Sequence, residues 1–80
     1  MDITTPRRAA EYVGLWVAHG GGMNALRFAR AATDIANVAK SYTEYGHRIA
    51  AEECWAAVSV LAAASLEAEH AEKSRAAGGR

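Results

Sequence analysis

Two Glu-x-x-His motifs are the strongest candidates for a metal-binding site in this sequence. Glu44 and His47 form the first motif, and Glu67 and His70 form the second. Paired motifs of this kind, with a Glu from each of two further helices, hold di-iron centres in helix bundles. Here Gly46 interrupts the first motif, and the two motifs lie about six helical turns apart. We therefore expect ordinary surface residues and no metal ion.

The other catalytic patterns are weaker. The run from His19 to Gly22 matches the lipase oxyanion-hole motif as letters, but the sequence lacks the G-x-S-x-G elbow that the motif requires. It is not a phosphate loop either, because no strand precedes it and no G-K-[ST] follows. The single cysteine, Cys54, follows two acids that disfavour a thiolate, so we expect a buried and unreactive side chain. We predict that the protein is not an enzyme and needs no cofactor.

Three helices would carry these residues. Residues 48–77 contain no Gly or Pro and many Ala, which predicts one long helix. A second helix is expected over 25–45, capped by Asn24 and ended by Gly46 in a left-handed conformation. A first, short helix should begin at Thr5 and Pro6 and stop at the glycine run. The sequence predicts an all-α fold in which the short N-terminal helix packs on a long antiparallel helical hairpin. We expect a single helical domain over residues 1–75 and a disordered tail over 76–80.

The spacing of apolar residues predicts which faces are buried. The second helix should present a heptad seam, which favours a long partner helix at a shallow angle. Its expected members are Phe28, Ala31, Ile35, Val38, Tyr42 and Tyr45. The expected inward stripe of the third helix is Ala51, Trp55, Val58, Ala62 and Ser65, with Leu61 beside it and Leu66 at its edge. Gly14, in the first helix, predicts close approach of a neighbouring helix.

Size and charge restrict the function. Twenty of the 80 residues are Ala, so the core is thin, and small helical domains often complete such a core by pairing with a copy or a partner. The formal net charge is zero, whereas nucleic-acid-binding domains usually carry a basic excess. The apolar run from Ala56 to Leu66 is shorter than the roughly 20 residues of a membrane span, and no signal peptide is recognisable. We expect a cytoplasmic protein that contacts neither a membrane nor nucleic acid directly.

The candidate partner-binding residues are acidic or aromatic. They are Glu52, Glu53, Glu67, Glu69, Glu72, Tyr12 and Tyr45. The glutamates would dock on a basic groove of a nucleic-acid-handling complex by imitating phosphate charge, and the tyrosines would anchor the interface. The simpler interpretation of the glutamates is a solvated face. Arg7, Arg8, Arg27, Arg30 and Arg48 would form a basic patch if the first helix packs near the start of the second.

The small size, alanine-rich composition and helix plan together resemble the small helical proteins of phages of high-GC bacteria, in particular the anti-CRISPR inhibitors of type I systems. The resemblance extends over the whole chain and rests on no motif, because these inhibitors share none. It implies no catalysis and stoichiometric binding to a CRISPR effector complex in the bacterial host cytoplasm, which prevents target DNA from engaging. We therefore predict a non-catalytic protein-binding inhibitor. A self-associating structural or adaptor module, in the simplest case a homodimer, and a small DNA-binding regulator are the alternatives.

Overall fold

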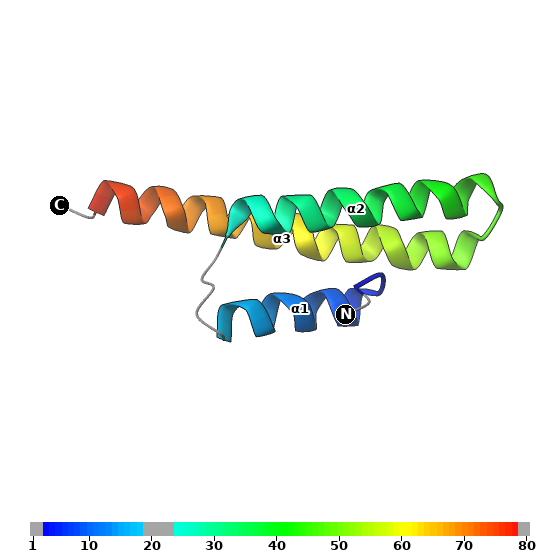
Figure 1. Ribbon diagram of the computed structural model, residues 1–80, viewed down its shortest axis with the longest axis horizontal. Coiled ribbons are helices and arrows are strands. Elements are labelled where there is room, and N and C mark those ends of the chain that lie inside the picture. Colours follow the sequence, from blue (N-terminus) through cyan, green and yellow to red (C-terminus); the bar gives the residue numbers. More distant parts are fainter. Residues whose placement is uncertain (1–2, 19–23, 79–80) are drawn as a thin grey trace.

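The computed structural model describes residues 3–18 and 24–78, and within these ranges the chain is helical without strands. Helix α1 covers Pro6–Ala18, α2 covers Ala25–Glu44 and α3 covers Arg48–Gly78. Helices α2 and α3 run antiparallel, side by side, and α1 lies along the middle of α3 (Figure 1). The predicted all-α fold, a short N-terminal helix on a long helical hairpin, is confirmed. The molecule is a rod with extents of 52 × 20 × 13 Å.

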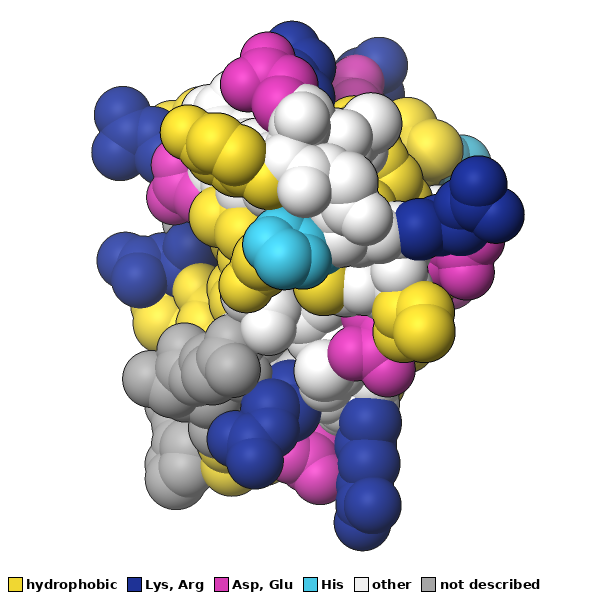
Figure 2. Space-filling view, turned by 90° about the vertical axis from the view of Figure 1, so that its right-hand side faces the viewer, with side chains coloured by type: hydrophobic (Ala, Val, Ile, Leu, Met, Phe, Trp, Pro, Cys, Tyr) yellow, Lys and Arg dark blue, Asp and Glu magenta, His cyan; other side chains and the backbone are white. Residues whose placement is uncertain are grey.

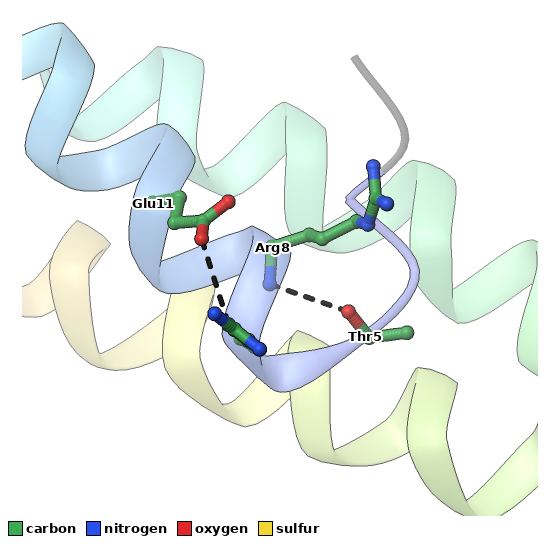
Figure 3. Close-up of polar contacts among 4 residues, drawn as sticks. Thr5, Arg8 and Glu11 are labelled. Carbon is green, nitrogen blue, oxygen red and sulfur yellow. Dashed lines mark hydrogen bonds and ion pairs between the residues drawn. The ribbon is translucent and has the colours of Figure 1, made fainter.

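Local capping signals set the helix ends. The Thr5 hydroxyl accepts a hydrogen bond of 3.2 Å from the Arg8 backbone N–H, and Pro6 is the first residue of α1 (Figure 3). The Asn24 side chain accepts a 2.9 Å bond from the Arg27 backbone N–H. Such caps typically stabilise a helix by about 1 kcal/mol. Gly46 takes the turn at a φ of 77°, which other L-residues rarely adopt. These start and turn predictions are confirmed.

Helix α3 ends one residue beyond the helix predicted over 48–77, whereas the disordered tail expected from residue 76 is wrong at its start. Helix α3 continues through residues 76–78, the first three of the expected tail. Residues 79 and 80 lie outside the described residues, as does the run from His19 to Gly22.

Small side chains dominate the contact between α2 and α3. The buried positions of α3 follow one another at intervals of three or four residues: Ala51, Cys54, Ala57, Leu61, Ala64 and Ala68. Those of α2 are Phe28, Ala31, Ile35 and Ala39. Because most of these side chains end at Cβ, the two helices can approach closely. Cys54 is buried, as predicted.

The inward stripe expected for α3 is confirmed at Ala51, which is buried, and at Val58 and Ser65, which are half-buried, but it is wrong at its other two positions. Trp55 is 41% exposed and Ala62 is exposed, whereas Leu61, expected beside the stripe, is fully buried. The α2 seam is confirmed at Phe28, Ala31 and Ile35, and Tyr42 packs partly buried against the core, but Val38 and Tyr45 are exposed. The seam passes through Ala39 instead of Val38. A small residue on α2 faces the small residues of α3, and the bulkier valine is displaced to the edge.

Helix α1 packs mainly on α3 and reaches α2 through aromatic side chains. Ala9 is fully buried in the core that it shares with α2 and α3. The Tyr12 ring meets the Phe28 ring edge-to-face, with centroids 6.4 Å apart. Gly14 does not mark close approach, because a Cβ built there would meet nothing within 4 Å. In Figure 1, α1 covers the middle of α3 and leaves both its ends uncovered.

Candidate functional site

One side of α3 is apolar and has no helix packed on it. No charged residue stands between Glu53 and Glu67, so this stretch is uncharged all the way round. Its inner side forms the core, and the side opposite is exposed. We define the outer face of α3 as Ile49, Trp55, Ala56, Ser59, Ala62, Ala63 and Leu66. Its large side chains are far from buried, since Ile49 is 77% and Leu66 68% exposed.

The outer face has the spacing of a helix-packing seam. Ile49, Ala56 and Ala63 are seven residues apart, and Ser59 and Leu66 interleave with them at the same interval. This is the heptad pattern by which one helix packs along another. Helix α3 therefore carries two such seams on opposite sides. Helices α1 and α2 cover one seam, and no described residue covers the other.

Two polar contacts fix α2 on the inner side of α3. The Ser65 hydroxyl donates a 3.0 Å hydrogen bond to the Ala25 carbonyl. The Ala25 backbone N–H donates a 3.0 Å bond to the Glu72 carboxylate. Both contacts join the start of α2 to a side of α3 that does not include Leu66 and Ala63. The outer face thus stays accessible because α2 is anchored elsewhere.

The structure does not bring the five candidate glutamates into one surface. All are exposed, but Glu53 and Glu67 are about 21 Å apart along the helix axis, at 1.5 Å per residue. The glutamates form two groups, Glu52 with Glu53 and Glu67 with Glu69 and Glu72. At the hairpin end, acidic side chains are interspersed with basic ones (Figure 2). Glu52 and Glu53 lie between Ile49 and Trp55, and the second group follows Leu66, so the two groups can act as charged flanks of the apolar stretch between them.

Two glutamates of the second group already interact with other groups of the same chain. Glu69 forms an ion pair of 3.3 Å with Lys73, as its i, i+4 spacing predicts. Glu72 accepts the hydrogen bond from α2 described above. A partner would therefore meet an acidic group that is partly neutralised by its own helix.

The two candidate tyrosines differ in their surroundings. Tyr45 follows α2 at the turn and is 78% exposed, so its ring is available to a partner. Tyr12 is half-buried and packs against both core clusters. Tyr12 is thus first a structural residue of α1, with only part of its ring at the surface.

The candidate arginines are not one patch. Arg7 forms an exposed ion pair of 3.7 Å with Glu11, drawn as a dashed line in Figure 3. The Arg27 guanidinium lies 4.0 Å from the centre of the Trp16 ring, a cation–π contact. Arg27 and Arg30 line an open groove between α1 and α2, and Asp34 lines the same groove. The groove therefore carries both signs of charge.

The Glu-x-x-His motifs stay apart. His47 contacts the Tyr42 ring edge-to-face at 6.0 Å, and His70 is exposed on α3. Among the described residues, no group of three or more His, Cys, Asp or Glu side chains is arranged to hold a metal ion.

Helix α3 also has the length and composition of a membrane-crossing helix over Arg48–Arg75. This stretch is longer than the run from Ala56 to Leu66 that stands out in the sequence. In its most apolar window only 28% of the residues are buried, so much of the apolar side chain surface is open. Core helices of other proteins satisfy the same criterion, and a membrane surface is therefore one occupant of the outer face to be tested.

No protein-family model matches the chain, and comparison with curated proteins and with solved structures finds no match. The resemblance to anti-CRISPR inhibitors stays a prediction from size, composition and helix plan.

Proposed function

We propose that the protein is a non-catalytic protein-binding module that acts by occupying another protein surface, and that its contact surface is the outer face of α3. One observation carries the proposal: Trp55 and Leu66 stand exposed along the uncharged stretch between Glu53 and Glu67, and Ile49 stands exposed just before it. Exposed apolar patches rimmed by polar residues mark interaction sites. Protein interfaces characteristically combine an apolar centre with a polar rim.

The narrower proposal is inhibition of a nucleic-acid-handling complex, such as a type I CRISPR effector. Its support is the exposure of all five glutamates and of Tyr45. Because the glutamates form two separate groups along α3, this function requires a partner with two separate basic regions. A complementary surface would offer an apolar strip of helix length with basic residues at its two ends, instead of one continuous basic groove.

Two equally exposed leucines make the test of the contact surface. Leu66 on α3 is 68% exposed and Leu26 on α2 is 67% exposed. Wild type, Leu66→Asp and Leu26→Asp would each be used for affinity capture from host cells, with circular dichroism to confirm equal helicity. We expect the specifically captured protein to be lost with Leu66→Asp and retained with Leu26→Asp. Equal capture by all three would exclude the outer face as the contact surface.

The inhibitor function needs its own assay. Expression in a host with an active type I system should restore the plating of a targeted phage, and charge reversal of Glu52, Glu53, Glu67, Glu69 and Glu72 should remove that protection. If the charge-reversed variant restored phage plating at equal protein levels, this would contradict the role of the glutamates. No restoration by wild type would contradict the CRISPR partner.

A further inference from the structure

We propose that a second copy of this chain occupies the outer face, through antiparallel pairing of the two α3 helices around a two-fold axis near residue 61. This inference rests on the proposed function, because it names the partner of the same apolar surface. A two-fold contact is closed and uses the same patch on both subunits. The outer face meets that requirement because its features are complementary when one copy is reversed against the other.

Side-chain size sets the register. If Ser59 faces Ala63 of the partner subunit, the seven-residue repeat fixes the other layers. Ala56 then faces Leu66 of the partner subunit, and the symmetric contact repeats at the other end. Each exposed leucine is thus placed over an alanine, and the small residues meet at the centre. Large side chains over small ones are what close helix packing requires.

Charge supports the same register. Four residues before Ala56, the exposed Glu52 carboxylate faces the imidazole of His70 of the partner subunit, which can donate a hydrogen bond to it. Two-fold symmetry supplies this pair at both ends of the contact. A shift by one heptad would place either Glu52 opposite Ala63 of the partner subunit or Ala56 opposite Lys73 of the partner subunit. Both shifts leave a charge facing an alanine. The proposed register also has one unmatched charge, since Lys73 of the partner subunit faces Ile49 in the outermost layer, where a long lysine side chain can reach solvent.

The position of the other helices leaves room for this pairing. Helices α1 and α2 both pack on the inner side of α3. A second α3 can therefore pack on the outer face without overlapping either helix of the first subunit. The uncovered seam runs from Ile49 to Leu66, which is about 25 Å of helix axis. The two subunits would form a layered assembly with the α3 pair in the middle.

Repulsion between like charges at one edge of the contact opposes association. Glu53 lies near Glu67 of the partner subunit in this register, and both side chains are exposed. Like charges at a rim repel one another, and salt screens the repulsion. Association is therefore expected to strengthen as ionic strength rises, whereas a dimer held mainly by salt bridges would weaken.

Multi-angle light scattering coupled to size exclusion, over a wide concentration range, tests the pairing. We expect wild type and Leu26→Asp to reach the mass of a dimer. Leu66→Asp should dimerise roughly a hundredfold more weakly, because the change occurs twice in each dimer and central apolar residues carry most of the binding energy. A monomeric wild type at all concentrations, or a dimer indifferent to Leu66→Asp, would overturn the proposal.

Cysteine cross-linking tests the register in a Cys54→Ala background. A mixture of Ser59→Cys and Ala63→Cys proteins should form the mixed disulfide faster than either protein forms its own. Equal rates would overturn the register. An Ala29→Cys protein, altered at an exposed alanine of α2, should not cross-link and controls for random collision.

The competing occupants give different results. A monomeric wild type that floats with phosphatidylcholine and phosphatidylglycerol vesicles, and loses flotation with Leu66→Asp, would assign the face to a membrane and overturn the pairing. A monomeric wild type that captures a different protein through Leu66 would also overturn the pairing. In that second case the proposed protein-binding function stands, so the two failures are distinguishable.

Discussion

The inner and outer faces of α3 are both rich in alanine and each carries a leucine, but their surroundings are opposite. The inner face buries Ala57, Leu61 and Ala64 against the rest of the chain, and the outer face exposes Ala56, Ala63 and Leu66. Both faces follow the heptad spacing of helix packing. The comparison indicates that a seam of small residues with an occasional leucine becomes core only where another helix supplies matching small residues, as α2 does on the inner face.

The largest expected difference between the faces is at a matched pair of leucines. Leu61→Ala removes a fully buried side chain and should lower the free energy of unfolding by about 2–5 kcal/mol. Leu66→Ala should change it by less than about 0.5 kcal/mol in the dilute monomer. Urea denaturation followed by circular dichroism measures both. Similar losses at the two positions would mean that the faces are not different in the monomer.

The next difference is at two adjacent alanines. Ala57→Leu inserts bulk between close-packed helices and should cost about 1–3 kcal/mol of unfolding free energy. Ala56→Leu, on the exposed side of the same turn, should leave the monomer unchanged and disturb the dimer, because it crowds Leu66 of the partner subunit. Thermal unfolding and light scattering separate the two effects. A stable Ala57→Leu protein would show that the inner seam is loosely packed.

The smallest difference is at two serines. Ser65→Ala removes the 3.0 Å hydrogen bond to the Ala25 carbonyl and should cost about 1 kcal/mol. Ser59 donates only to the Trp55 carbonyl of its own helix, at 3.3 Å, so Ser59→Ala should be neutral or slightly stabilising. Paired urea titrations would detect the contrast. A larger loss at Ser59 would contradict the assignment of Ser65 as the residue that fixes α2.

The ends of the helices could be predicted from the sequence because they depend on local chemistry. Thr5, Asn24 and Gly46 act through neighbouring backbone groups, and each is where its residue type predicts. The fold class followed from the absence of Gly and Pro in the long helix and from the tight turn at Gly46.

The phase of α3 could not be predicted in the same way. An uncharged stretch reads as apolar on every side, so periodicity alone offers no choice between Trp55 and Leu61 as the inward residue. The choice depends on α2, whose Ala31 and Ala39 accept a close neighbour. The division of the glutamates, by contrast, follows from their residue numbers once the long helix is predicted, because a rise of 1.5 Å per residue separates Glu53 from Glu67 by about 21 Å.

The most direct measurement is carbene footprinting of the purified protein at rising concentration, read residue by residue by mass spectrometry. The account predicts that labelling of Trp55 and Leu66 falls as subunits pair, whereas labelling of the equally exposed Leu26 stays constant. Labelling that is independent of concentration at all three residues, or that falls equally at Leu26 and Leu66, would contradict the pairing of two copies through the outer face of α3.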